Sequence, residues 1–214
     1  MSYTPDEIRA EAAQAMQKPQ SMYKAAVFNR RGPRNRGERR YTEIAAEYLL
    51  AHHDNWKDHI PRVEREGKYR VEHTGEVPAG GNPESEKRQA IALFNERREG
   101  GFGKIIDYQV PLKGKRIDKA GEIDLLAEQG DDLVLLEFKL AKKRGEETLL
   151  RAVLEVYTYS RQINAQALLD EWGKNGTLQK AVLLQSASRA IPPEDQIIQV
   201  NLLRRELGVD VYIL

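Results

Sequence analysis

The chain has 214 residues, of which 40% are hydrophobic, so it is long enough to bury a core of its own. It has no cysteine, which excludes disulfides, thiolate metal sites and cysteine nucleophiles, and any bound metal must therefore be held by oxygen or imidazole ligands. Although 31% of the residues are charged, the formal net charge is only +1, so a basic surface for nucleic acid would have to be local.

Residues 1–80 are predicted to form an N-terminal extension. An Ala- and Gln-rich helical segment ends where Pro19 interrupts it, and apolar residues at helical spacing predict a short helix around residues 44–49. Between them, residues 30–40 carry six arginines, opposed by one glutamate and interleaved with glycine and proline. That composition is typical of a flexible basic arm. Turn-forming residues after the short helix place the domain boundary near Gly80.

Residues 81–214 are predicted to form an α+β domain with a central mixed β-sheet flanked by helices. Asn82 is a good N-cap and Pro83 suits the first helical position, so a helix is expected to begin there. Short links between three strand-like segments then predict an antiparallel meander. In chain order, the predicted elements are a helix at 82–99, strands at 105–112, 116–128 and 133–140, a long helix from about 146, a strand at 181–185, a helix after 193 and a strand at 209–214.

The pairing of the second and third predicted strands places two carboxylates opposite each other. Whether the hairpin loop holds two or four residues, the register is the same, so Asp124 faces Glu137, and Lys139 faces Glu122. Like charges at opposed positions are destabilising unless something compensates them. A divalent cation would do so, and two carboxylates with the backbone carbonyl of Phe138 suit Mg²⁺, for which Mn²⁺ can substitute.

Lys139 projects from the same strand face as Glu137, two residues further on. An ammonium group there is suited to positioning a metal-activated water or to stabilising charge that develops on a phosphoryl group. The remainder of that face is apolar and the opposite face, which includes Ile123, is apolar throughout, so both faces are expected to be covered, with the charges at one rim. A purely structural alternative is a Glu122–Lys139 ion pair beside two solvated carboxylates.

An Asp, a short turn and an apolar strand that ends in Glu-x-Lys together resemble the motif of the PD-(D/E)XK nuclease superfamily, with Ile123 where a proline is usual. The predicted elements over residues 82–185 follow the order of that family. The resemblance implies a restriction-endonuclease-like core and metal-dependent hydrolysis of phosphodiester bonds, with DNA favoured over RNA. It assigns catalysis and metal binding to Asp124, Glu137 and the Phe138 carbonyl, with Lys139 as a further catalytic residue.

The resemblance also points to the flanking helices. Glu86 falls on the helix face that points to the sheet, where family members often carry an additional carboxylate that binds metal; the alternative is an interaction with the helix dipole. In the later helix, Glu155 and Tyr159 lie four residues apart, where some relatives carry a Gln and a Tyr that help to hold substrate or metal.

Two basic segments are candidates for contact with phosphates. One is the basic arm and the other directly follows the Glu-x-Lys strand, and the candidate residues are Arg34, Arg36, Arg39 and Arg40 in the first and Lys142, Lys143 and Arg144 in the second. The alternatives are a solvated charge run or, for the arm, a protein partner.

Three functions therefore remain open from the sequence. They are a Mg²⁺-dependent DNase, a non-catalytic nucleic-acid-binding module on the same fold, and an RNA-processing nuclease. The family resemblance is also compatible with a homodimer, because duplex-cutting members often act as dimers. No apolar run reaches the length of a membrane span and residues 1–9 lack the apolar stretch of a signal peptide, so we expect a cytoplasmic protein without membrane contact.

Overall fold

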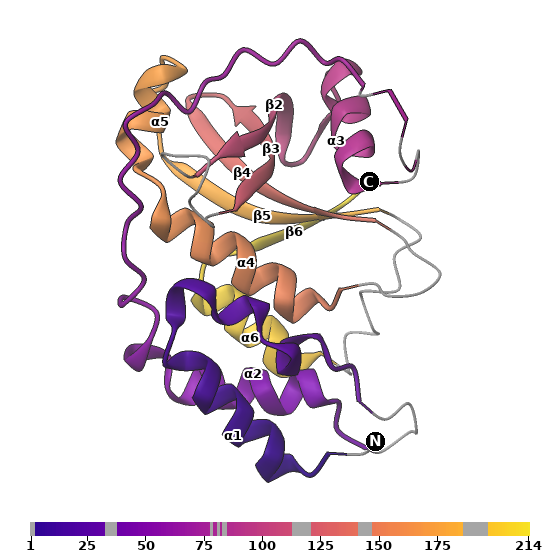
Figure 1. The fold of residues 1–214 in the computed structure, drawn as a ribbon, viewed down its shortest axis with the longest axis vertical. Helices are drawn as coiled ribbons and strands as arrows, with labels where there is room; N and C mark the ends of the chain where they lie inside the picture. The colour runs from indigo at the N-terminus through magenta and orange to yellow at the C-terminus, as the bar shows by residue number, and fades with distance from the viewer. Residues whose placement is uncertain are drawn as a thin grey trace.

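The computed structural model describes residues 3–32, 38–77, 79–80, 82, 85–112, 121–140, 147–185 and 197–214. Its centre is a six-stranded sheet whose spatial order equals the chain order (Figure 1). The first four strands form an antiparallel meander and the last two add in parallel, so the sheet is mixed, as predicted. The strands are β1 (Glu99–Gly100), β2 (Gly103–Pro111), β3 (Glu122–Gln129), β4 (Asp132–Lys139), β5 (Leu178–Leu184) and β6 (Asp210–Ile213).

Helices cover both faces of the sheet (Figure 1). One face carries α3 (Glu86–Asn95) and the other carries α4 (Leu149–Gln162), with α5 (Ala165–Glu171) following it. Beyond α4 lie the N-terminal and C-terminal helices, and in the described part of the chain no helix is long and apolar enough to cross a bilayer. These outer elements are α1 (Pro5–Met16), the 3₁₀ turns η1 (Pro19–Lys24) and η2 (Ala26–Asn29), α2 (Tyr41–Ala51), η3 (His53–Asn55) and α6 (Ile198–Glu206).

Helix α3 begins later and ends earlier than the sequence predicted. Its N-cap is Ser85, whose hydroxyl accepts the Arg88 N–H, and not Asn82. Ser and Asn cap helices about equally well, and the choice of Asn82 depended on Pro83, which lies outside the described residues. At the other end, the N–H groups of Arg97 and Arg98 bond back to the last carbonyls of the helix, and this turns the chain into β1.

The sheet separates two apolar cores. Along β4, Val134 and Leu136 belong to the core under α3, whereas Leu133 and Leu135 belong to the core on the α4 side. Ile123 was predicted to share the sheet face of Val134 and Leu136, and this is wrong: it packs in the α4-side core. Pairing between β2 and β3 extends to Glu122, the first residue of β3, whereas pairing between β3 and β4 stops at Leu125. The first residues of β3 therefore diverge from β4.

The α4-side core also contains the N-terminal elements. Ile8, Phe28, Leu49 and Trp56 are fully buried in it, so core packing continues across the sequence boundary predicted near residue 80. A carboxylate ties the two parts as well, because Glu43 of α2 accepts the N–H groups of Gln199 and Val200 at 2.8 and 3.0 Å. Helix α6 has no side-chain cap of its own, so Glu43 takes over that role from a distance of 156 residues in sequence.

This cap predicts a specific loss of stability. Glu43→Ala should lower the free energy of unfolding by about 1–3 kcal/mol, because one buried and one partly buried N–H group and the positive end of the α6 dipole lose their partner. Glu47→Ala on the same helix removes an exposed ion pair with Arg39 and should cost less than about 1 kcal/mol. Urea denaturation compares them, and equal losses would contradict the capping role of Glu43.

Candidate active site

Asp124 and Glu137 lie where β3 and β4 part. The observed pairs run from Gln129 opposite Asp132 to Leu125 opposite Leu136, which is the predicted register, and one further step places Asp124 beside Glu137. The Asp124 side chain replaces the missing ladder bond, because its Oδ2 accepts the Phe138 N–H at 3.0 Å. The Phe138 side chain points away into the α3-side core, so Asp124 is fixed to the backbone next to Glu137.

Lys139 is the centre of a buried group of charges. Its Nζ lies 2.6 Å from Glu137 Oε1, 2.7 Å from Glu147 Oε2 and 3.6 Å from Glu155 Oε2. Lys139 and Glu137 are 6% and 4% exposed, so solvent screens these contacts little. Glu122, which was predicted to lie opposite Lys139, is exposed and pairs with Pro111 of β2. The ammonium is therefore held toward the α4 side of the sheet.

A polar stripe along α4 completes this group. Arg151, Glu155 and Tyr159 are spaced four residues apart and so share one face of the helix. Arg151 Nε lies 3.0 Å from Glu147 Oε1, and the Tyr159 hydroxyl donates to Glu155 Oε1 at 3.0 Å. Glu147 and Arg151 were not predicted as site residues, although their four-residue spacing with Glu155 and Tyr159 was a usable signal.

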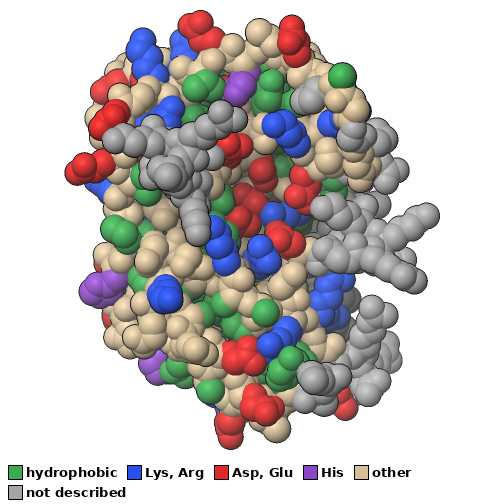
Figure 2. All heavy atoms as spheres, viewed as in Figure 1, with side chains coloured by type: hydrophobic (Ala, Val, Ile, Leu, Met, Phe, Trp, Pro, Cys, Tyr) green, Lys and Arg blue, Asp and Glu red, His purple; other side chains and the backbone are tan. Residues whose placement is uncertain are grey.

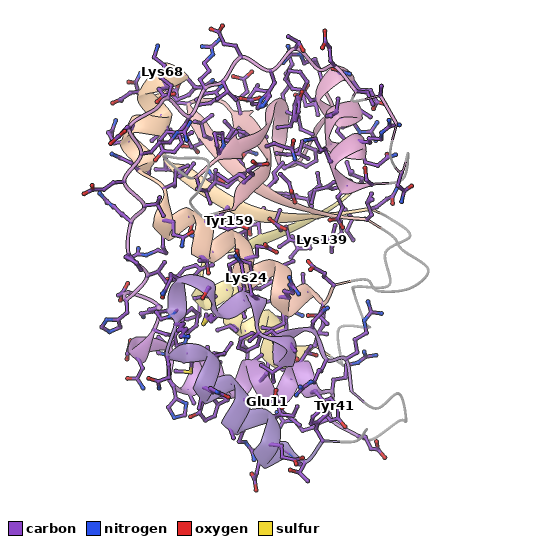
Figure 3. The ribbon with its side chains drawn as sticks, in the orientation of Figure 1. Glu11, Lys24, Tyr41, Lys68, Lys139 and Tyr159 are labelled. Atoms are coloured by element: carbon purple, nitrogen blue, oxygen red, sulfur yellow. The ribbon has the colours of Figure 1, made fainter. Side chains whose placement is uncertain are left out.

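Gly121 makes room for the tyrosine of this stripe. A Cβ at position 121 would lie 2.1 Å from the Tyr159 hydroxyl oxygen, well inside contact distance. The absence of a side chain just before β3 therefore lets Tyr159 approach the strand that carries Asp124. Figure 3 shows Tyr159 and Lys139 on the same side of the sheet, from α4 and β4 respectively.

The pKa values of Asp124 and Glu137 are both raised. Burial, followed by the charges of other carboxylates, raises the pKa of Asp124 to about 6, and Lys139 opposes the shift. Burial and the neighbouring charge of Asp124 also raise the pKa of Glu137 well above its ordinary value. Burial alone would lower the pKa of Lys139, but the carboxylates around it outweigh this effect and raise it. Lys139 therefore stays an ammonium at neutral pH.

Glu86 approaches the site from the other face of the sheet. It is the first residue of α3, is partly exposed, and its charge contributes to the raised pKa of Asp124. The inward direction of the Glu86 side chain stays a prediction, and its charge acts on Asp124 of the carboxylate pair. Figure 2 shows acidic and basic side chains gathered near the middle of the molecular face that carries this site.

Those basic residues predicted to contact phosphates that lie in the described ranges do not join this charged group. Arg39 forms an exposed ion pair with Glu47 at 3.2 Å, and Arg40 lies at the N-cap of α2. Arg30, at the start of the arm, pairs with Glu11 and lies over the ring of Tyr3. The remaining predicted contacts lie outside the described residues: Arg34, Arg36, Lys142, Lys143 and Arg144.

The donor set fits a hard cation in charge and in chemistry. In the described ranges, no three His, Asp or Glu side chains already converge on one metal position. However, the contacts above join four carboxylates, those of Asp124, Glu137, Glu147 and Glu155, to the two cations of Lys139 and Arg151. When all four carboxylates are ionised, this leaves an excess of two negative charges in a buried place, which is why the pKa values of Asp124 and Glu137 are raised without metal. One divalent ion with oxygen ligands would balance that excess.

Comparison with known proteins does not assign the chain to a family. No protein-family model, no curated protein and no solved structure gives a significant match. Function therefore has to be inferred from the chemistry of the site.

The raised pKa of Asp124 predicts how the stability of the metal-free protein depends on pH. In the folded state the pKa of Asp124 is about 6, compared with 3.8 for the free group, so folding favours the protonated form. The contribution of Asp124 is present below about pH 4 and is lost as pH rises through about 6. In chelator, melting temperature should fall over this interval, and Asp124→Asn should reduce the fall.

Asp132 provides a control of opposite sign. Its pKa is lowered, first by a hydrogen bond from the Thr177 backbone, so its ionised form stabilises the fold. Asp132→Asn should therefore lower the melting temperature at neutral pH, where Asp124→Asn raises it. If both substitutions changed the melting temperature in the same direction, the pKa of Asp124 would not be raised by folding.

Proposed function

We propose that this protein is a metal-dependent nuclease of the PD-(D/E)XK type that hydrolyses phosphodiester bonds in DNA. The observation that supports this most directly is the carboxylate pair of Asp124 and Glu137 at the point of strand divergence, with the buried ammonium of Lys139 beside it. Buried like charges destabilise a fold. A site that keeps them is best explained by chemistry that needs them.

The residues divide into ligands and a charge stabiliser. Asp124, Glu137 and the Phe138 carbonyl would hold Mg²⁺ or Mn²⁺, and Glu86 would add a carboxylate from α3. When bound, such an ion lowers the pKa of a coordinated water and offsets negative charge on a phosphoryl group. Lys139 remains protonated, so it can orient the attacking water or donate a hydrogen bond to a phosphate oxygen as charge develops there.

Glu155 and Tyr159 have a supporting role in this proposal. Glu155 is 3.6 Å from the Lys139 ammonium, and the Tyr159 hydroxyl holds the other oxygen of Glu155. Glu155 contacts the catalytic lysine and Tyr159 contacts Glu155, so they position the lysine and need not touch substrate or metal. Glu147, at 2.7 Å from Lys139, acts in the same way from the position just before the Thr148 N-cap of α4.

A binding module without catalysis is the alternative that the site argues against. Nucleic-acid binding alone calls for cations that face the phosphates. Here the cation is buried among carboxylates, and a module that only binds would be more stable with these acids replaced. Cleavage assays on DNA and RNA, in duplex and single-stranded form, distinguish the enzyme from the module and identify its substrate.

Lys139→Met and Glu137→Gln should fail in different ways. Lys139→Met removes the ammonium and keeps the apolar stem, so cleavage should drop at least about a hundredfold while Mg²⁺ binding survives. Stability in chelator should also drop, because the surrounding carboxylates lose their counterion. Glu137→Gln should weaken Mg²⁺ binding measured by calorimetry, without reducing stability in chelator.

Lys174→Met is the matched control. Lys174 pairs with Glu128 at 2.8 Å at the opposite end of β3, so the same change of charge there should leave cleavage intact. If wild-type protein binds nucleic acid but cuts none of the substrates with either Mg²⁺ or Mn²⁺, the binding module replaces the nuclease.

The basic arm should contribute affinity that does not depend on sequence. Replacing Arg34, Arg36, Arg39 and Arg40 with Ala should weaken DNA binding and flatten the dependence of log K on log salt, because fewer counterions are released. Arg39 already pairs with Glu47, so Arg39→Ala alone should have the smaller effect. Unchanged affinity and slope for the fourfold variant would exclude the arm from the interface.

A further inference from the structure

The turns η1 and η2 hold both ends of α4. At its N-terminus, Asn29 Oδ1 accepts the Thr148 N–H at 2.8 Å, and the Thr148 hydroxyl donates to the Phe28 carbonyl. At its C-terminus, the Gln162 side chain donates to the Gln20 carbonyl at 3.2 Å. Helix α4 carries Glu155, one of the three carboxylates that contact Lys139, so the position of that lysine depends in part on a segment more than a hundred residues earlier in the chain.

Between these two ends, a pair of buried tyrosines joins η1 to the polar stripe of α4. The hydroxyl oxygens of Tyr23 and Tyr159 are 3.1 Å apart, and their rings meet edge to face. The residues are 2% and 5% exposed. Lys24, the last residue of η1, places its Nζ 5.4 Å from the ring centroid of Tyr23 and is labelled below Tyr159 in Figure 3.

The direction of this hydrogen bond follows from counting protons. A tyrosine hydroxyl has one proton, and that of Tyr159 is donated to Glu155 Oε1. Tyr23 must therefore be the donor to Tyr159. The result is a one-way chain from Tyr23 to Tyr159 and on to Glu155, whose second oxygen faces the Lys139 ammonium at 3.6 Å.

We propose that Tyr23 is a positioning residue of the nuclease site, which acts through Tyr159 and Glu155 to hold the Lys139 ammonium in place. This inference rests on the proposed function. Of the three carboxylates around Lys139, Glu137 is also needed as a metal ligand, so the other two must hold the lysine when metal is bound. Glu155 can do so only while its orientation is fixed, and the tyrosine pair fixes it.

Tyr23→Phe tests this directly, because it keeps the ring and its edge contact and removes only the hydroxyl. We expect kcat to fall about five- to tenfold, the effect of one hydrogen bond, while KM for DNA and the Kd for Mg²⁺ stay within about twofold. Tyr159→Phe should lower kcat at least as much. The double variant should be no slower than Tyr159→Phe alone, because both hydroxyls act through one chain.

Tyr48→Phe is the matched control. It removes a hydroxyl from α2, where the Tyr48 ring stacks on His52 outside the chain of hydrogen bonds, and kcat should stay at the wild-type value. Melting temperatures of all variants should lie within a few degrees of wild type, the effect of losing about one hydrogen bond in a chain of this size.

A second measurement does not depend on cleavage. The rate at which an acylating reagent modifies Lys139 in the presence of Mg²⁺, resolved by peptide mass spectrometry, reports how firmly the ammonium is held. Tyr23→Phe should raise this rate several-fold and leave that of Lys174 unchanged.

The outcomes separate the two proposals. If wild-type protein cuts no nucleic acid, the nuclease proposal fails and the modification rate alone decides the role of Tyr23. If wild-type protein cuts but Tyr23→Phe leaves the modification rate unchanged, the role of Tyr23 is overturned and the nuclease stands. Additive losses in the double variant would also overturn it, because they would mean that the two hydroxyls act independently.

Discussion

The interaction on which the site depends is the contact of one buried ammonium with carboxylates from two layers of the fold. Lys139 and Glu137 come from β4, and Glu147 and Glu155 come from the start and the middle of the α4 segment. Removing water from such charges costs several kcal/mol each, and only close opposite charges offset that cost. The sheet and α4 are therefore joined at this edge by electrostatics, whereas apolar packing joins them elsewhere.

The site also depends on a local failure of the sheet. Normal pairing of β3 with β4 would fill the space beside Glu137 with backbone, but the ladder stops at Leu125 and the Asp124 side chain bonds to the next free N–H. Functional sites commonly break a rule of regular structure and depend on the surroundings to compensate. Here the compensation comes from two cores that bury both faces of the remaining sheet.

Much of the centre of the site could be predicted because it is local. Strand register follows from the length of a hairpin loop, so the neighbourhood of Asp124 and Glu137 was accessible from the sequence. Local signals failed in two places. Ser85 and Asn82 are about equally good N-cap residues, so the sequence could not decide between them. Ile123 was placed on the wrong face of the sheet because β3 leaves its partner strand there.

Contacts between distant segments were beyond the reach of periodicity. The link from Tyr23 to Tyr159 and the cap that Glu43 gives to α6 join residues 136 and 156 positions apart. No spacing rule relates such residues, because their proximity is decided by how the layers pack. Some expected surface charges were likewise found in partnerships within the chain, as with Arg39 and Glu47.

The distance in sequence between η1 and α4 has a consequence for the order of events during synthesis. Tyr23 leaves the ribosome long before Tyr159, and their contact closes a loop of 136 residues, which is slow because a long loop must be ordered before the contact can form. The charged centre around Lys139 can therefore reach its final arrangement only after most of the chain has been made. A nascent chain, held close to messenger RNA, would carry the carboxylates of the site but not the packing that aligns them.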